Sequence, residues 1–292
     1  MKIKIGISFL TVFIYNIFLA LFSFLWFEVD LKYYLILLVL GSLIIFLVTY
    51  YKVIKPTLSM IDRWEQTENM RKEFVANVTH EFKTPLTSIS GFVETLQEGA
   101  DEDREVRKKF LDIIAIETSR LSRLIEDVFI LSDIESRKTQ EALESFDVGT
   151  ALRKIVMSIN PVAQAKGIEI LLEVKGNPVI KGNQDRFSQM MMNLIENAVK
   201  YSKEGKSISV SAEENQENIV VSVKDEGIGI EEKEIPRLFE RFYRVDKSRS
   251  KDMGGTGLGL SIVKHIASLF DAQIKVTSEP GRGTTFTVAF PK

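Results

Sequence analysis

The chain has 292 residues, a formal net charge of −2, two histidines and no cysteine. The lack of cysteine excludes disulfide bonds, thiolate metal sites and a cysteine nucleophile, and two histidines are too few for an all-histidine metal centre. The nearly balanced charge gives no sign of a nucleic-acid partner, so we expect none. The length allows two ordinary domains in addition to a membrane part.

Two uncharged segments lie near the start of the chain, at residues 5–27 and 33–51. Each is close to the roughly 20 apolar residues that a transmembrane helix needs. Lysines precede the first segment and follow the second, which predicts that both termini are cytoplasmic. We therefore expect residues 1–52 to form a two-pass region in the cytoplasmic membrane. A cleaved signal peptide is the alternative for the first segment, disfavoured because the apolar run is long and a second span follows at once.

The loop expected outside the membrane is short, at residues 28–32. It offers too little surface for an extracellular ligand pocket, which needs roughly 300 Å³. We therefore expect the signal to enter through the spans, from membrane lipid or from a membrane protein partner. After the second span, apolar positions three or four apart predict a helical linker over residues 53–70.

Residues 71–138 predict two amphipathic helices on either side of a turn at 97–103. Their apolar positions recur every three or four residues and form one stripe on each helix. A hairpin of two such helices cannot bury both stripes alone, so we expect a homodimer in which two hairpins form a four-helix bundle. A monomeric hairpin packed against the following domain is the alternative.

The first of these helices contains the sequence FVANVTHEFKTPLTS, residues 74–88. His80 and Thr84 share a polar face that lies off the apolar stripe, and Glu81 follows the histidine directly. Pro85 removes the hydrogen bond to the carbonyl group of Glu81, which predicts a bend. An exposed histidine beside a carboxylate and a bend is typical of a functional site. A solvated surface histidine is the alternative.

Residues 143–292 predict an α+β sandwich, with one sheet covered by helices on one face. The prediction rests on segments in which apolar residues alternate, as in strands, and on segments between them in which apolar residues recur every three or four positions, as in helices. Strands are expected at 146–148, 168–174, 207–214, 218–227, 272–279 and 283–290, and helices at 149–166 and 185–201.

The second of these helices carries the sequence NLIENAVKY, residues 193–201. Asn193, Glu196, Asn197 and Lys200 are three or four residues apart and share one face. Carboxamide oxygens suit a hard cation such as Mg²⁺, and a lysine one turn later suits the phosphates that the cation carries. Solvated asparagines on a helix surface are the alternative.

Two glycine-containing segments follow. Asp225 ends a strand in DEGIGI, where Gly227 and Gly229 let the backbone approach a ligand closely. Residues 253–270 form a glycine-rich loop that leads into an amphipathic helix, whose free N–H groups make an anion site. An ordinary turn and a flexible loop are the respective alternatives.

Dinucleotide and P-loop interpretations of the second loop are set aside. Gly255, Gly257 and Gly259 are followed by leucine where the dinucleotide fingerprint has its third glycine, and no Gly-Lys-Ser/Thr sequence follows.

Taken together, the motifs resemble those of the bacterial two-component sensor histidine kinases, of the phosphate-regulon and cell-wall sensor branch. The five segments that carry the resemblance occur in the family's order and span about residue 70 to the C-terminus: THEFKTPLTSISGFVETL, NLIENAVKYS, DEGIGI, LFERFYRVD and GGTGLGL. The implied fold is an all-α dimerisation and histidine phosphotransfer hairpin, followed by an ATP-binding domain of the Hsp90 and histidine-kinase type.

The resemblance implies a membrane protein-histidine kinase with ATP and Mg²⁺ as cofactors. His80 would be phosphorylated from ATP, Glu81 would orient its ring and take up the proton, and the phosphoryl group would pass to an aspartate of a cognate response regulator. Thr84 matches the position that places a water for dephosphorylating that regulator.

The residues that the resemblance assigns to the nucleotide are Asn193, Asn197, Lys200, Tyr201, Asp225, Gly227, Gly229, Arg241, Phe242, Arg244, Gly255, Thr256, Gly257, Leu258 and Gly259. Asn197, with Asn193 near it, would hold the Mg²⁺ ion. Arg244 to Gly254 would form a flexible segment beside the phosphates.

Asn193 favours transfer over hydrolysis. In related water-splitting ATPases a glutamate that acts as general base stands four residues before the metal-binding asparagine, and an asparagine at that position cannot act as a base. Water would therefore be poorly activated, and His80 would be the acceptor. A plain ATPase and a non-catalytic membrane scaffold with a decayed nucleotide site are the alternatives.

Overall fold

The computed structural model describes residues 14–15, 17–18, 21–22, 31–136, 143–245 and 255–292. The chain divides into two compact units, Met1–Val75 and Ala76–Lys292. Helix α3 (Lys55–Thr95) contributes residues to both units.

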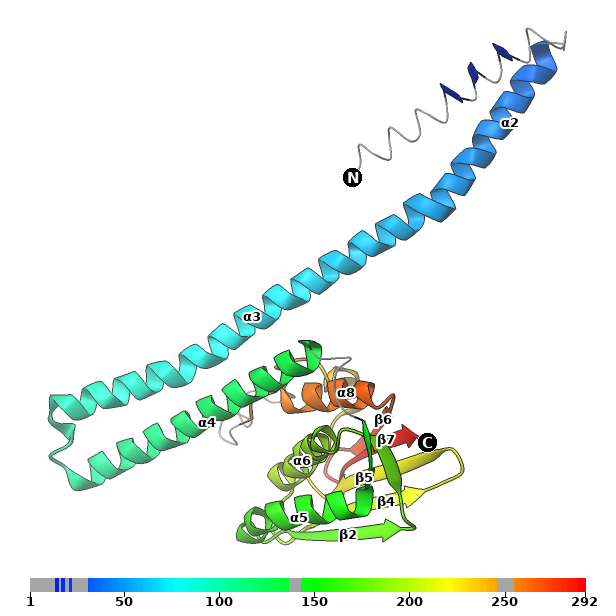
Figure 1. Cartoon of the computed structure of the whole chain (residues 1–292). Coiled ribbons are helices and arrows are strands. Elements are labelled where there is room, and N and C mark those ends of the chain that lie inside the picture. The colour runs from blue at the N-terminus through cyan, green and yellow to red at the C-terminus, as the bar shows by residue number, and fades with distance from the viewer. Residues whose placement is uncertain (1–13, 16, 19–20, 23–30, 137–142, 246–254) are drawn as a thin grey trace. The chain divides into compact units, whose positions relative to one another are not determined.

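The first unit is helical wherever it is described. Helix α2 (Leu31–Thr49) leads through a short π-helical segment, Tyr50–Ile54, into the first part of α3 (Figure 1). Apolar side chains of α2 such as Val39, Leu43 and Ile44 are exposed, as is expected of a helix whose surroundings are lipid rather than protein.

Among the described residues, one helix is long and apolar enough to cross a membrane by length and composition. Most of the first predicted span, residues 5–27, and residues 28–30 of the predicted loop lie outside the described part of the chain. The two-pass topology therefore stays a prediction. The last two residues of the predicted loop, Leu31 and Lys32, belong to α2.

The second unit begins with a helical hairpin. Residues from Ala76 onwards complete α3, and helix α4 (Arg104–Ser136) returns beside it after the π-helical turn Leu96–Ala100. Gly99 adopts φ = 109° in this turn, a backbone conformation that favours glycine. The rings of Phe92 and Phe110 are 4.9 Å apart between their centroids and close the hairpin next to the turn.

Pro85 lies inside α3, and the helix continues on both sides of it. The proline ring is buried, although most of the surrounding helix surface is exposed or half-buried. Several apolar side chains of the hairpin remain exposed in a single chain: Leu86, Val93, Leu111, Ile116, Ile125 and Phe129.

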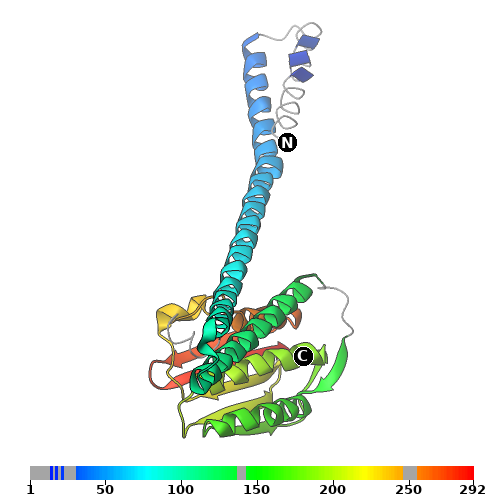
Figure 2. The ribbon, with the colours of Figure 1, turned by 90° about the vertical axis from the view of Figure 1, so that its left-hand side faces the viewer.

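The rest of the second unit is an α/β domain. Its main sheet has the order β2-β4-β5-β7-β6, in which β2 and β4 are parallel and the other neighbours antiparallel. The five strands are β2 (Glu169–Lys175), β4 (Ser207–Glu214), β5 (Asn218–Asp225), β6 (Gln273–Glu279) and β7 (Gly283–Pro291). The helices that pack on one face are α5 (Val148–Ala165), α6 (Gln184–Tyr201) and α8 (Gly259–Leu269) (Figures 1 and 2).

Residue alternation along the strands explains the two faces of the sheet. In β5, Ile219, Val221 and Val223 are buried under the helices, while the residues between them face the open side. Phe187 and Phe290 are fully buried, with ring centroids 5.6 Å apart, and join α6 to β7. The core that fixes α6 on the sheet is therefore apolar and continuous.

One part of the sheet prediction is wrong. The strand expected at 146–148 is β1 (Glu144–Asp147), and it pairs with β3 (Val179–Gly182) in a separate two-stranded sheet. The domain therefore contains two sheets. Asp147 ends β1 and caps α5, because its carboxylate accepts a hydrogen bond from the Thr150 amide at 2.6 Å.

Candidate functional site

His80 lies on the exposed surface of α3, in the second unit of the chain. Thr84, one turn later, directs its hydroxyl group to the backbone carbonyl oxygen of His80 at 3.3 Å. The two predicted residues are therefore neighbours on one face, and the His80 ring is accessible to solvent.

Glu81, the residue after the histidine, is held by two arginines. Its Oε2 atom accepts hydrogen bonds from Arg120 Nη2 at 3.1 Å and from Arg244 Nη2 at 3.2 Å. Arg120 comes from α4 and is only 6% exposed, and Arg244 comes from the predicted nucleotide region. The two guanidinium groups therefore fix the position of the carboxylate beside the His80 turn.

Asp225, at the end of β5, is 6% exposed. Its Oδ1 atom accepts hydrogen bonds from the Gly227 amide at 2.8 Å and from the Thr284 amide at 3.1 Å. Burial raises the pKa of Asp225, and the two amides lower it. Because both amides bond to Oδ1, the Oδ2 atom is left for a donor on a ligand.

Gly227 and Gly229 make close backbone approaches that no other residue permits. A Cβ atom on Gly227 would lie 2.5 Å from the Tyr201 carbonyl oxygen, and one on Gly229 would lie 2.1 Å from the Glu279 carbonyl oxygen. Gly229 also has φ = 67°. The predicted segment at 225–230 is thus packed against the end of α6 and the β6–β7 turn.

Asn193 and Asn197 lie half-buried on α6, as the sequence predicts for one face. The Nδ2 atom of Asn193 donates to the Gln189 carbonyl oxygen at 3.1 Å, which turns its Oδ1 atom toward Gly259. A Cβ atom on Gly259 would lie 2.8 Å from this oxygen. The glycine therefore allows the first turn of α8 to approach the asparagine.

Lys200 and Tyr201 end α6 and lie close to Arg244. Burial lowers the pKa of Lys200 to about 8, and the charge of Arg244 is the next contribution. Burial raises the pKa of Tyr201, and Arg244 lowers it. The Lys200 ammonium group lies 5.2 Å from the centroid of the Tyr201 ring. This end of α6 is therefore a partly dehydrated, electropositive surface.

The second glycine-rich segment meets the LFERFYR segment directly. The Phe242 amide donates to the Gly257 carbonyl oxygen at 2.9 Å, and Phe242 has φ = 61°. A Cβ atom on Gly257 would lie 2.9 Å from Phe242 Cα. Leu258 is fully buried and anchors the loop, while Gly255 and Arg241 are half-buried. Residues 246–254, which contain most of the expected flexible segment, lie outside the described residues.

Thr256 uses its hydroxyl group twice. It donates to Asp127 Oδ2 on α4 at 2.5 Å and accepts from the Leu258 amide at 3.2 Å. Burial raises the pKa of Asp127, and the hydrogen bond from Thr256 lowers it.

Within the described ranges, no group of three or more histidine, cysteine, aspartate or glutamate side chains could hold a metal ion. A Mg²⁺ ion that arrives with phosphates needs only one or two protein oxygens, because it keeps several waters. The half-buried carboxamide of Asn197 fits this requirement. Asn193 fits less directly, because its Nδ2 atom is bonded to the Gln189 carbonyl oxygen and only its Oδ1 atom, which faces Gly259, is left for the ion.

Sequence reasoning missed three contributors to this site. The sequence pattern places Gly283 and Thr284 only in a hairpin, yet the Thr284 amide donates to Asp225, and a Cβ atom on Gly283 would lie 2.0 Å from the Asp225 carbonyl oxygen. Arg120 was not singled out either. The sequence GRGTT did signal a tight turn, but not its contact with β5.

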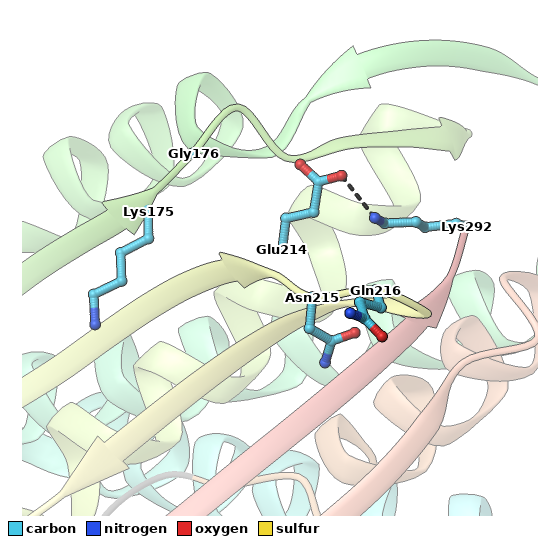
Figure 3. Close-up of a pocket in the computed structure, with 6 residues that line it drawn as sticks. All are labelled: Lys175, Gly176, Glu214, Asn215, Gln216 and Lys292. Carbon is cyan, nitrogen blue, oxygen red and sulfur yellow. Dashed lines mark ion pairs between the residues drawn. The ribbon is translucent and has the colours of Figure 1, made fainter.

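A hollow of about 490 Å³ lies at the opposite end of β5 from Asp225 (Figure 3). All of its lining residues are exposed, and Lys292 points across it to Glu214, with 2.8 Å between Nζ and Oε1. The remaining lining residues are Lys175, Gly176, Asn215 and Gln216. These groups do not converge as the residues at the end of α6 do, so this hollow is not the candidate site.

Comparison with protein families gives two matches. Residues 70–137 match the His Kinase A (phospho-acceptor) domain, and residues 182–292 match the Histidine kinase-, DNA gyrase B-, and HSP90-like ATPase family. His80 lies in the first match, and the polar face of α6 and both glycine-rich segments lie in the second.

Two curated proteins are similar over 78% of this chain. They are the sensor histidine kinase WalK of Bacillus subtilis, at 37% identity over 230 residues, and the sensor-like histidine kinase SenX3 of Mycobacterium tuberculosis, at 37% identity over 228 residues. The chain spans only 38% of the length of WalK and 55% of that of SenX3.

Solved structures of histidine kinases share the fold. ShkA in complex with AMPPNP aligns with a TM-score of 0.56 and 28% identity, over 75% of this chain and 45% of that one. ThkA in complex with the response regulator protein TrrA aligns with a TM-score of 0.61 and 24% identity, over 79% of this chain and 66% of that one.

Proposed function

We propose that this chain, which belongs to the bacterial two-component sensor histidine kinases of the WalK and SenX3 type, phosphorylates its own His80 with ATP and passes the phosphoryl group to an aspartate of a response regulator. The match to the phospho-acceptor domain and the match to the ATPase family together cover both halves of this reaction.

The observation that carries the proposal is the meeting of three sequence-distant segments at the end of α6. Asp225 is buried with one carboxylate oxygen left for a ligand donor, Gly227 packs on the Tyr201 backbone, and Gly259 packs on Asn193. In our proposal, Asp225 accepts a hydrogen bond from the adenine amino group, and Tyr201 lies beside the base.

The phosphates of ATP then lie at the Lys200 end of the site. Lys200 and Arg244 supply positive charge, and the backbone N–H groups at the start of α8 supply an anion site. Thr256, Gly257 and Leu258 lie in the loop before α8 and approach the phosphates from that side. Phe242 supports this loop through its bond to Gly257, with Arg241 beside it.

Asn197, with Asn193 as a weaker second candidate, would hold Mg²⁺ through a carboxamide oxygen. The ion, when bound, neutralises phosphate charge during transfer. The carboxamide of Asn197 fixes the orientation of the phosphates relative to Lys200.

In the transfer step, an imidazole nitrogen of His80 forms a bond to the γ-phosphorus atom while the bond from that phosphorus to the bridging oxygen breaks. ADP is the leaving group, and the proton of the ring passes to Glu81. Arg120 and Arg244 both hold the Oε2 atom of Glu81, so its Oε1 atom is the one proposed to receive the proton. The exposed His80 ring is accessible to a second protein, as transfer to a regulator requires.

The remaining parts of the proposal concern partners and location. The exposed apolar side chains of the hairpin support a homodimer with a four-helix bundle. The fold shared with ThkA, which was solved with a response regulator protein, supports a regulator as partner. The apolar helix α2 supports a location in the bacterial cytoplasmic membrane. Two spans with both termini in the cytoplasm are proposed from the uncharged segments 5–27 and 33–51 and the lysines beside them. Signal entry from lipid or from a membrane protein partner is part of the same proposal.

Thr84 is proposed to place a water against the phosphorylated regulator. In the absence of the regulator, its hydroxyl group is directed to the His80 carbonyl oxygen, which keeps it on the same face as the ring. This role is separable from phosphorylation, because the hydroxyl is not needed for transfer to the ring.

A plain ATPase is the second candidate function, and Asn193 disfavours it, since a carboxamide cannot activate water. The test uses the full chain in detergent micelles with γ-labelled ATP and Mg²⁺. We expect an acid-labile, alkali-stable label on the protein that is absent in His80→Gln and in Asn197→Asp, while His80→Gln still binds ATP. Steady ADP release without labelled protein would favour the ATPase, and a label on the His80→Gln variant would refute the assignment.

A further inference from the structure

Two side chains proposed to contact the nucleotide phosphates are hydrogen-bonded to carboxylates of the helical hairpin. Arg244 donates to Glu81 at 3.2 Å, and Thr256 donates to Asp127 at 2.5 Å. Glu81 belongs to α3 and Asp127 to α4. The hairpin therefore presents one carboxylate to each of two donors beside the end of α6.

These carboxylates are chemical equivalents of phosphate oxygens. A guanidinium group binds carboxylate and phosphate in the same geometry, and a hydroxyl group donates to either. The charge of Arg244 acts on both Lys200 and Tyr201, so Arg244 already lies at the electropositive end of α6 while it is bonded to Glu81.

A third polar contact joins α4 to the same domain at a distance from the phosphates. Arg186 at the start of α6 forms an ion pair with Asp133, and both side chains are largely buried. This contact does not involve a residue of the proposed nucleotide site. It therefore holds the hairpin against the domain whether or not the site is occupied.

We propose that Glu81 and Asp127 compete with the nucleotide phosphates for Arg244 and Thr256, so that this docking of the hairpin and the binding of nucleotide exclude each other at these two residues. The inference rests on the proposed function, because it requires a nucleotide at this site. It adds that ATP, by taking Arg244, removes one of the two arginines that hold Glu81, the residue proposed to receive the proton of His80, while Arg120 stays bonded to it.

The environment of Asp127 explains why losing the Thr256 hydroxyl group is unfavourable for this carboxylate. Its carboxylate is partly dehydrated, which raises its pKa, and Thr256 is the first contribution that opposes this effect. Arg123 and Glu126 of the same helix act on it with opposite signs. A buried carboxylate that loses its hydrogen-bond donor is costly. When a phosphate takes the Thr256 hydroxyl, Asp127 loses the donor that stabilises its charge, and this loss opposes nucleotide binding.

The test measures the affinity of the full chain for AMPPNP with Mg²⁺ by calorimetry in detergent micelles. Asp127→Ala removes one of the two competing carboxylates and changes no residue of the proposed nucleotide site, so we expect AMPPNP to bind at least threefold more tightly. Asp127→Asn keeps the shape but loses the charge, and it should also bind more tightly. Glu126→Ala is the matched control, because it removes the same charge from the adjacent, exposed position on α4 and should bind as the original chain does.

A double-mutant cycle locates the effect at Thr256. In a Thr256→Val background, Asp127→Ala should no longer tighten binding, because the hydroxyl group for which they compete is gone. Equal affinity of Asp127→Ala, Asp127→Asn and Glu126→Ala would overturn the competition alone. Failure of the unaltered chain to bind AMPPNP would overturn the proposed function and this inference with it.

Discussion

Lys200 gives the nucleotide affinity a pH dependence that can be worked out from its environment. Burial lowers its pKa from 10.5 to about 8 in the nucleotide-free chain. At pH 7 about nine tenths of the molecules carry the charge, and at pH 9 about one tenth do. Bound phosphates favour the ammonium form and return the pKa to near its ordinary value. At pH 9, Lys200 must therefore take up a proton from the solvent when the nucleotide binds. This uptake becomes less favourable as the pH rises, so the affinity for AMPPNP should fall about tenfold between pH 7 and pH 9.

Calorimetric titration of the full chain with AMPPNP and Mg²⁺ at half-unit pH intervals measures this profile. Lys200→Arg is the matched control, since a guanidinium stays charged throughout the range. Because this charge is constant, the affinity of the variant for AMPPNP should vary less than about twofold over the same interval. A flat profile for the unaltered chain would refute the reasoning, as would an equal fall in the arginine variant.

Two further predictions concern single positions. Thr84→Ala should keep most of the autophosphorylation but slow the dephosphorylation of the phosphorylated regulator, measured as loss of label from the regulator; equal loss of both activities would mean that Thr84 only supports the helix. Gly229→Ala should lower the melting temperature much more than Gly281→Ala. Both glycines have positive φ, but a Cβ atom on Gly229 would lie 2.1 Å from a carbonyl oxygen whereas nothing lies within 4 Å of one on Gly281. Positive φ alone costs a residue with a Cβ atom roughly 1 kcal/mol of stability. Equal shifts in melting temperature would therefore show that the backbone around Gly229 moves to accommodate the Cβ atom.

Local patterns in the sequence predict the long elements well. Helix α6 begins at Gln184, one residue before the expected position, because Asn183 caps it by accepting from the amides of Asp185 and Arg186. Strands such as β4 and β5 alternate buried and half-buried residues over most of their length, which is the pattern that the alternation of apolar and polar residues predicts.

The pairing of short strands could not be predicted in the same way. Strand β3 has only four residues, Val179–Gly182, and its pairing with β1 joins segments more than thirty residues apart. Neither strand is long enough for its alternation to specify a partner or a sheet. The sequence thus predicted one sheet where there are two.

The residues of the candidate site also fall into those that the sequence identifies and those that it does not. The glycines and asparagines were recognisable because their residue types are required by the chemistry or by close approach, as for Gly227 and Gly259. Thr284 acts through its backbone amide, which carries no information about residue type. The pairing of Glu81 with Arg120 and Arg244 depends on how the hairpin and the domain fold together, with partners 39 and 163 residues away in sequence.

The central claim is that His80 accepts the γ-phosphoryl group of ATP. The most direct measurement is mass spectrometric mapping of the full chain after incubation with ATP and Mg²⁺, with digestion kept at alkaline pH because phosphohistidine is lost in acid. We expect one phosphoryl group on the peptide that contains His80, located on the imidazole ring. A phosphoryl group on any other residue, or ADP formed while the His80 peptide stays unmodified, would contradict it.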